Sequence, residues 1–161
     1  MKYSIVYSST GNTKLLADAI KNELNDDDLV YYGKPDRYAL EADLIYVGFW
    51  TDQSVCDDVT KDFLRKIHNK NIFLFGSAGY GNKEYFEKIN KATEEYLDET
   101  VTVVDYFMCQ GKMGPQIKQK YLDILAKDPD NKRINFMLQL FDAALTHPNQ
   151  DDFNDLIKKI K

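Results

Sequence analysis

Short apolar segments alternate with segments of helical periodicity along the first two thirds of the chain. The short segments are rich in β-branched and aromatic residues, which predicts strands at 3–7, 29–32, 44–48, 71–76 and 101–107. Apolar residues at helical spacing follow the first, third and fourth of these segments. The helix after the third segment is expected at about 55–67, with Val59, Phe63, Leu64 and Ile67 on one face. This order predicts an α/β fold: a three-layer αβα sandwich around a five-stranded parallel sheet of order 2-1-3-4-5, joined by right-handed crossovers.

The last third of the chain is predicted to be helical and to exceed what such a fold requires. One helix is expected near 116–127, and a break at 128–130 separates it from an amphipathic helix and from a last short helix after 149–151. Because no repeat or linker divides the chain, we expect a single domain over 1–161. Residues 128–161 would then form a C-terminal helical extension packed on that domain. An alternative role for this extension is docking of a partner or of a second copy.

The composition disfavours several classes of function. The net charge of −5 at pH 7 argues against binding to nucleic acid or to anionic membranes, since both need a cationic surface. No apolar run approaches the length of a membrane span, and we expect no signal peptide and a cytoplasmic protein. Cys56 and Cys109 have no metal-ligand or redox spacing and are expected to be buried thiols. The isolated His68 and His147 indicate no metal site.

A hydroxyl-rich loop links the first predicted strand to the first predicted helix. It consists of Ser8, Ser9, Thr10, Gly11, Asn12 and Thr13. The free N–H groups and the positive dipole end of the following helix favour an anion at this loop. Hydroxyls and a glycine without any basic residue suit a compact phosphate monoester held by neutral donors, which indicates a bound cofactor. The alternative is that these residues only cap the helix and shape the turn.

Other phosphate sites do not fit the sequence around this loop. The chain has no G-x-x-x-x-G-K-S/T motif, which disfavours a nucleoside triphosphate, and no G-x-G-x-x-G after the first strand, which disfavours a dinucleotide. The loop has no Cys or Arg, so a cysteine-based phosphatase is unsupported. A receiver domain needs acidic residues after the first strand and an Asp ending the third. Here the third strand ends in Gly48-Phe49-Trp50.

The run from Ser8 to Thr13 resembles the flavodoxin signature S/T-x-T-G-x-T, which holds the phosphate of FMN in that family. The resemblance extends over most of residues 2–115. It implies that the phosphate is bound by the side-chain hydroxyls of Ser8, Thr10 and Thr13. The backbone amides of Ser9, Gly11 and Asn12 would complete the site. A terminal monoester favours FMN over FAD as the cofactor.

A second loop of this resemblance follows the third predicted strand. It contains Phe49, Trp50, Thr51, Asp52, Gln53 and Ser54, and in flavodoxins it lines one face of the isoalloxazine ring. Trp50 is the only Trp in the chain and is expected to stack on the flavin, the alternative being a core or edge aromatic. Ser54 with Asp57 or Asp58 is expected to cap the next helix.

A third loop follows the fourth predicted strand. It contains Gly76, Ser77, Ala78, Gly79, Tyr80, Gly81 and Asn82, whose small residues permit close approach of the backbone to a ligand. The resemblance implies that an aromatic residue here covers the other face of the flavin ring. Tyr80 is the candidate. Tyr85 is the alternative, because Asn82 departs from the G-x-G-D pattern of flavodoxins.

A fourth segment, residues 108–115, follows the fifth predicted strand near the rim of the expected site. Its run Gln110-Gly111-Lys112-Met113 resembles a stretch in short bacterial flavodoxin-like proteins of anaerobes. We interpret the segment as a connecting loop before a helix that begins at a proline.

The resemblance implies an electron carrier that passes electrons through FMN between two redox partner proteins, a reductase and an acceptor enzyme. The sequence shows no acid, base or nucleophile for bond-making chemistry. Carboxylates near the site are expected to lower the flavin potential by like-charge repulsion, namely Asp52, Asp57, Asp58 and Glu84. The alternatives are an FMN-dependent NAD(P)H:quinone-type oxidoreductase and a non-catalytic interaction protein. We expect a monomer or a weak dimer.

Overall fold

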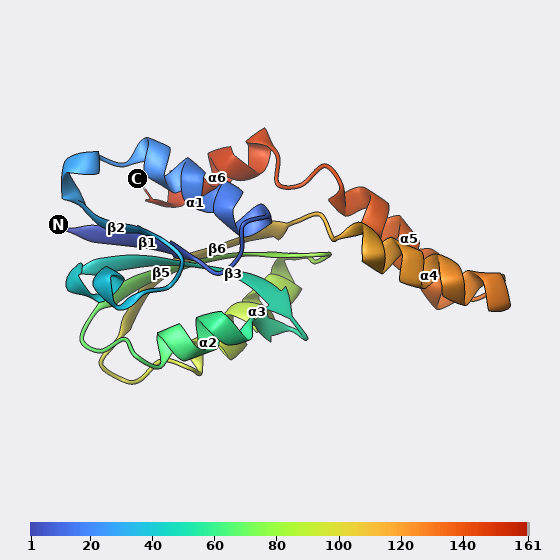
Figure 1. Cartoon of the computed structure of the whole chain (residues 1–161), viewed down its shortest axis with the longest axis horizontal. Helices are drawn as coiled ribbons and strands as arrows, with labels where there is room; N and C mark the ends of the chain where they lie inside the picture. Colours follow the sequence, from blue (N-terminus) through green and yellow to red (C-terminus); the bar gives the residue numbers. More distant parts are fainter. Residues whose placement is uncertain (161) are drawn as a thin grey trace.

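The computed structural model describes residues 1–160 and has a parallel sheet at its centre (Figure 1). The strands of this sheet are β1 (Tyr3–Tyr7), β2 (Leu29–Gly33), β3 (Leu44–Asp52), β5 (Asn71–Ala78) and β6 (Thr102–Gln110). They pair in parallel in the order β2-β1-β3-β5-β6, while the short β4 (Val55–Cys56) pairs antiparallel with the end of β3. Because β5 and β6 are the predicted fourth and fifth strands, the predicted fold and strand order are confirmed.

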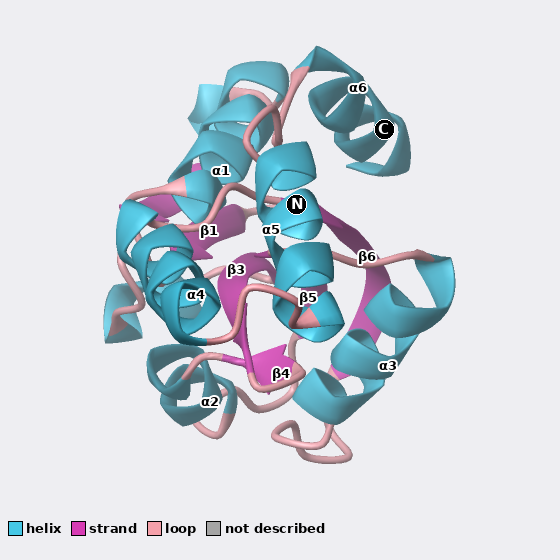
Figure 2. Ribbon diagram, turned by 90° about the vertical axis from the view of Figure 1, so that its right-hand side faces the viewer, coloured by secondary structure: helices cyan, strands magenta, loops and turns pink. Residues whose placement is uncertain are grey.

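Helices cover both faces of the sheet, as Figure 1 and Figure 2 show. On one face α1 (Asn12–Glu23) lies beside α6 (Gln150–Ile160), and the other face carries α2 (Asp58–Leu64) and α3 (Lys83–Glu94). The links on either side of β2 contain two short 3₁₀ helices, η1 (Asp26–Asp28) and η2 (Arg37–Glu41).

Successive residues of the central strands pack into different halves of the core. In β1, Ile5 belongs to the cluster that includes Leu16 of α1, whereas Val6 belongs to the cluster that includes Leu64 of α2, and all four side chains are fully buried. Side chains of a strand alternate between the two sheet faces, and here both faces are covered. This double coverage explains why the central strands read as continuous apolar runs rather than as alternating ones.

The last three helices do not all pack on the sheet. α4 (Pro115–Lys127) and α5 (Lys132–Ala144) pack against each other and project beyond the carboxyl ends of the strands (Figure 1). We call residues 115–144 the α4–α5 hairpin, and residues 111–117, which lead into α4, the base of the hairpin. Its own small core includes Ile134, Phe141 and Ala144, and Asn131 caps α5 by accepting a hydrogen bond from the Ile134 N–H at 3.0 Å. After the hairpin the chain returns to the sheet as α6, which packs on α1 and β6.

Strand β3 is longer than predicted, so part of the predicted second loop is a strand. β3 continues to Asp52 and folds back onto β4 through a two-residue turn, Gln53-Ser54, whose φ angles are 52° and 66°. Turns with two left-handed residues match the twist of an antiparallel hairpin. The sequence contains no Gly at this turn, which is why the prediction stopped the strand at residue 48.

Strand β5 is also longer than predicted, and it includes Ser77 and Ala78 of the predicted third loop. The extra length comes from pairing, because Trp50 of β3 lies opposite Ser77 and Gln110 of β6 lies opposite Ala78. α2 begins only at Asp58, and its Val59, predicted on the buried face, is 55% exposed. Val55 and Cys56, which were expected to begin this helix, form β4 instead.

Two glycines in β3 and β5 make room for large side chains from the neighbouring strand. Gly48 lies opposite Phe75, and Gly76 lies opposite Phe49. A Cβ on Gly76 would lie 2.6 Å from the Phe49 ring, and a Cβ on Gly48 would collide with the Phe75 ring. Both phenylalanines are fully buried. Each glycine therefore provides the volume that the phenylalanine on the neighbouring strand fills.

We expect Gly76→Ala to lower the free energy of unfolding by about 1–3 kcal/mol, because the added methyl overpacks a dense core. Urea unfolding measures this change. In a Phe49→Leu background, which removes the ring from the contact, the cost of Gly76→Ala should fall below about 1 kcal/mol. An equal cost in both backgrounds would contradict the steric explanation.

Candidate functional site

Helix α1 begins without a side-chain cap. Its N-cap residue is Gly11, and no side chain of residues 1–160 caps its first turn by accepting a hydrogen bond. By contrast, Asp57, Asn82 and Asn131 cap α2, α3 and α5 through side-chain oxygens. The free N–H groups of α1 therefore lack an internal acceptor, and its positive dipole end lies at the carboxyl edge of the sheet.

The hydroxyls of the preceding loop have different partners. Ser8 Oγ donates to Asp57 Oδ1 at 2.7 Å, and Ser9 Oγ donates to Thr13 Oγ1 at 3.3 Å. Thr13 is fully buried, whereas Thr10 and Gly11 are exposed. The loop therefore exposes Thr10 and Gly11, while the hydroxyls of Ser8 and Ser9 donate hydrogen bonds within the protein.

The buried carboxylate of Asp57 joins three parts of the site. Its Oδ1 accepts hydrogen bonds from Ser8 Oγ at 2.7 Å, from Thr60 Oγ1 at 2.9 Å and from the Trp50 N–H at 3.2 Å. Its Oδ2 accepts from the Thr60 N–H at 3.2 Å, which caps α2. The Asp57 N–H in turn donates to the Trp50 carbonyl at 3.0 Å. Asp57 thus fixes the loop after β1 relative to Trp50, and the predicted capping role of Asp57 is confirmed.

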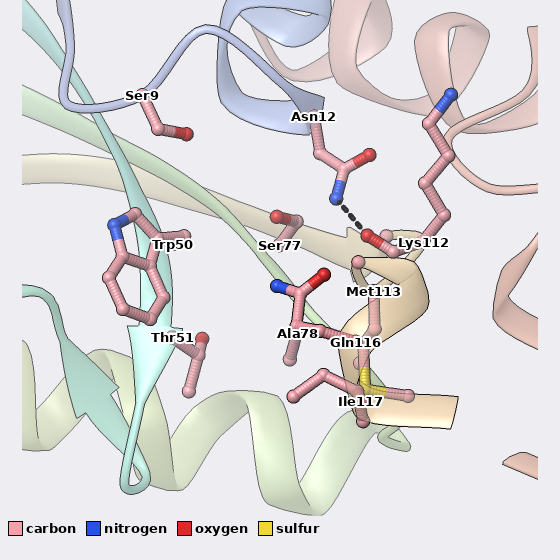
Figure 3. Close-up of a pocket in the computed structure, with 13 residues that line it drawn as sticks. Ser9, Asn12, Trp50, Thr51, Ser77, Ala78, Lys112, Met113, Gln116 and Ile117 are labelled. Atoms are coloured by element: carbon pink, nitrogen blue, oxygen red, sulfur yellow. Dashed lines mark hydrogen bonds between the residues drawn. The ribbon is translucent and has the colours of Figure 1, made fainter. Parts of the chain in front are cut away.

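A cavity of about 520 Å³ opens beside these groups (Figure 3). Ser9 and Asn12 line it at the start of α1, Trp50 and Thr51 line it from β3, and the end of β5 contributes Ser77, Ala78 and Gly79. Trp50 remains 43% exposed. The cavity therefore connects the uncapped end of α1 to the only indole of the chain.

The segment after β6 forms the remaining wall, which sequence reasoning missed. It contributes Gly111, Lys112, Met113, Gly114, Gln116 and Ile117 to the lining. Asn12 Nδ2 donates to the Lys112 carbonyl at 2.9 Å, so this segment is attached to the first turn of α1 (Figure 3). A Cβ on Gly111 would lie 2.5 Å from Asn12 Nδ2, so only a glycine permits this close approach. The resemblance of residues 110–113 to a stretch of related proteins was the signal that could have identified the wall.

Tyr80 does not line this cavity. It stacks on Tyr85 at 5.0 Å between ring centroids with 17° between the planes, and the Tyr85 hydroxyl lies 3.0 Å from Ser54 Oγ. Both tyrosines line a neighbouring hollow of about 200 Å³ together with Met137 and Leu140 of α5. The two hollows share Thr51, Ala78, Gly79 and Met113.

The predicted site residues therefore divide into two groups. The cavity brings together Ser9, Asn12, Trp50, Thr51, Ser77, Ala78 and Gly79. The others lie outside its lining: Ser8, Thr10, Gly11, Thr13, Phe49, Asp52, Tyr80 and Gly81. Phe49 is fully buried against Gly76, and the space above Gly81 is filled by the Phe86 ring. Lys112 is the one charged side chain among the lining residues that the structure describes, so the predicted carboxylates do not face the cavity.

The cysteines lie away from this chemistry. Both are buried free thiols, as predicted. Burial raises the pKa of the Cys56 thiol to about 11, and burial with the nearby Asp152 raises the pKa of the Cys109 thiol further. Both thiols are therefore neutral at physiological pH. Within residues 1–160 no cluster of His, Cys, Asp and Glu could hold a metal ion.

Within the same residues, no helix combines the length and the apolar character that crossing a bilayer requires.

The fold is of the doubly wound α/β class, and the cavity lies at the carboxyl ends of its parallel strands, where ligands bind in such folds. The family model described as "Flavodoxin domain" matches residues 4–161. The chain belongs to this flavodoxin family.

Two curated relatives are described as "Flavodoxin-like domain-containing protein BilS". The protein from Clostridium symbiosum (strain WAL-14163) is 35% identical over 171 residues, covering 94% of this chain and 90% of the relative. The protein from Clostridioides difficile (strain CD3) is 34% identical over 162 residues, with the same coverage of 94% and 90%. Among solved structures, the flavodoxin of Streptococcus pneumonia TIGR4 has a TM-score of 0.58 at 18% identity, covering 99% of this chain and 94% of that chain.

We expect Asp57→Ala to lower the free energy of unfolding by about 2–4 kcal/mol, because it removes a helix cap and leaves buried donors without an acceptor. Asp58→Ala is the matched control. The Asp58 side chain is 87% exposed and forms only a surface ion pair with Lys61, so its loss should cost under about 1 kcal/mol. Urea unfolding of both variants checks the difference, and equal costs would refute the structural role of Asp57.

Proposed function

We propose that this chain binds FMN in the cavity beside Trp50 and carries electrons between a reductase and an acceptor enzyme. The observation that carries this proposal is one continuous cavity that runs from the uncapped N-terminus of α1 to an exposed indole. The helix end, the exposed hydroxyl of Thr10 and the hydroxyl of Ser9 would hold the phosphate. Trp50 would lie against the flavin ring.

The residues present fit such a ligand. Asn12 Oδ1 and Thr51 Oγ1 are buried polar atoms without a hydrogen-bond partner in the described part of the chain, and both residues line the cavity. Buried acceptors and hydroxyls are normally paired, so these two atoms are suited to donors and acceptors of a bound molecule. The lining residues that the structure describes include no carboxylate, so no side-chain anion there would repel an anionic ligand. A volume of about 520 Å³ lies in the ordinary range of cofactor pockets.

The role as an electron carrier is supported by what lines the cavity. Bound FMN would accept and donate electrons, and the protein would supply binding, orientation and the local charge. The lining residues of the described chain include no carboxylic acid, histidine or cysteine that could act as an acid, base or nucleophile. Electron transfer needs no such group, whereas it does need a flavin near the surface. The exposure of Trp50 supports a ring site near the surface.

FMN affinity tests the cofactor proposal. We expect FMN to bind at least about 100-fold more tightly than riboflavin, because the phosphate would gain charge-assisted hydrogen bonds of about 1.5–3 kcal/mol each at the start of α1. Titration of the apoprotein with each flavin, followed by flavin fluorescence, measures the ratio. Affinities equal within about threefold would contradict a phosphate site at this loop.

Two substitutions that each introduce one negative charge test where the phosphate binds. Ser9→Glu places a carboxylate in the cavity, and repulsion should remove most of the preference for FMN over riboflavin. Thr102→Glu makes the same charge change at the opposite end of the sheet, where β6 begins, and should leave the preference unchanged. Equal loss in both variants would show that the net charge of the protein, and not this loop, sets the preference.

Turnover separates the carrier from an oxidoreductase. We expect the FMN-loaded protein to oxidise NADH or NADPH in the presence of a quinone only when a reductase is added. Absorbance at the nicotinamide band measures this rate. Rapid oxidation without a reductase would contradict the carrier role and favour the quinone oxidoreductase.

A further inference from the structure

We propose that Met113 and Ile117, at the base of the α4–α5 hairpin, form the second wall of the flavin-ring site in place of Tyr80. This inference rests on the proposed FMN site. It assigns a binding role to a part of the chain that lies outside the phosphate loop and outside the two ring loops expected from the sequence.

The cavity has two opposing sides. Trp50 and Thr51 extend into it from β3, and Met113, Gln116 and Ile117 face them from across the opening (Figure 3). Met113 and Ile117 are both partly buried and apolar. A planar ring that lies against the Trp50 indole would therefore have the thioether of Met113 and the aliphatic chain of Ile117 on its other side. Thioethers pack favourably on aromatic rings.

Gly79 shows how closely Met113 approaches the strand end. A Cβ on Gly79 would lie 2.6 Å from Met113 Sδ and 3.0 Å from its Cγ. The Met113 side chain therefore lies directly over residue 79. A larger side chain there would displace Met113 from the cavity wall, so the position of Met113 in the wall depends on a glycine at residue 79.

The Tyr80 side chain packs on another tyrosine and not on the cavity. Its ring lies against Tyr85, and this pair lines the neighbouring hollow with Met137 and Leu140 of α5. Tyr85 is anchored in turn, because its hydroxyl lies 3.0 Å from Ser54 Oγ in the β3–β4 turn. The stacked pair thus lies beside the hairpin, in a hollow whose described lining includes Met137 and Leu140 but not Trp50.

Hydrogen bonds hold the base of the hairpin at the cavity. The Gly111 N–H donates to the Ala78 carbonyl at 2.9 Å, and Asn12 Nδ2 donates to the Lys112 carbonyl at 2.9 Å. The Lys112 N–H donates to the carbonyl of His147 at 3.0 Å, which joins the segment entering α4 to the segment leaving α5. The wall is therefore tied to β5, to the first turn of α1 and to the end of the hairpin itself.

The test compares FMN affinity in three variants of the whole chain. We expect the double variant Met113→Ala/Ile117→Ala to bind FMN at least about 10-fold more weakly than the wild type, because it removes the apolar cover of one ring face. Tyr80→Ala should change the affinity less than about threefold. Leu122→Ala is the matched control on α4, because Leu122 is 42% exposed and lines neither hollow, and it should also stay within about threefold.

Two further readouts make the result decisive. The urea midpoint of each apoprotein shows whether a variant has lost its fold, and single Met113→Ala and Ile117→Ala variants replace the double variant if it has. The proposal is overturned if removing the wall changes FMN affinity less than about threefold, or if Tyr80→Ala weakens binding as much as removing the wall. A wild-type protein that binds no FMN would instead refute the proposed function, and the wall with it.

Discussion

At the carboxyl ends of β1 and β3, one buried carboxylate accepts four hydrogen bonds from three residues. Asp57 binds the Ser8 hydroxyl, the backbone N–H of Trp50, and the hydroxyl and N–H of Thr60. A buried charge is stable only where hydrogen-bond donors replace the water that it loses. Here Ser8 donates from the loop after β1, Trp50 from β3 and Thr60 from the first turn of α2. The same interaction that satisfies Asp57 therefore sets the distance between the loop after β1 and the indole of Trp50.

The parallel sheet makes this arrangement possible. Right-handed crossovers bring the ends of β1, β3, β5 and β6 to one edge, where ligands bind in open α/β sheets. The reciprocal pairs Gly48–Phe75 and Gly76–Phe49 keep β3 and β5 paired up to that edge, so Trp50 and Ser77 lie opposite each other. The α4–α5 hairpin then extends from β6 beyond the edge, and its base closes the side of the cavity that faces Trp50.

The sequence predicts the fold better than the details of the site. Apolar runs and helical spacing suffice to locate the strands, because the central strands β1, β3 and β5 are covered on both faces. They fail at the strand ends, since the φ angles of Gln53 and Ser54 and the pairing of Trp50 with Ser77 depend on tertiary contacts. The lining by Met113 and Ile117 was not predicted, because the resemblance of residues 110–113 puts a segment near the site without showing which side chains face it. The stacking of Tyr80 on Tyr85 could not be predicted either, since the residue type alone suits each tyrosine equally well to stacking on a flavin ring.

The crystal structure of the protein with bound FMN is the most direct test of the central claim, which is that the cavity between α1, Trp50 and the hairpin base is the flavin site. We predict the phosphate at the N-terminus of α1 beside Ser9 and Thr10, and the isoalloxazine ring between Trp50 on one face and Met113 with Ile117 on the other. A ring that stacks on Tyr80 with Met113 displaced would contradict the proposed second wall. A phosphate bound away from α1 would contradict the assignment of the site as a whole.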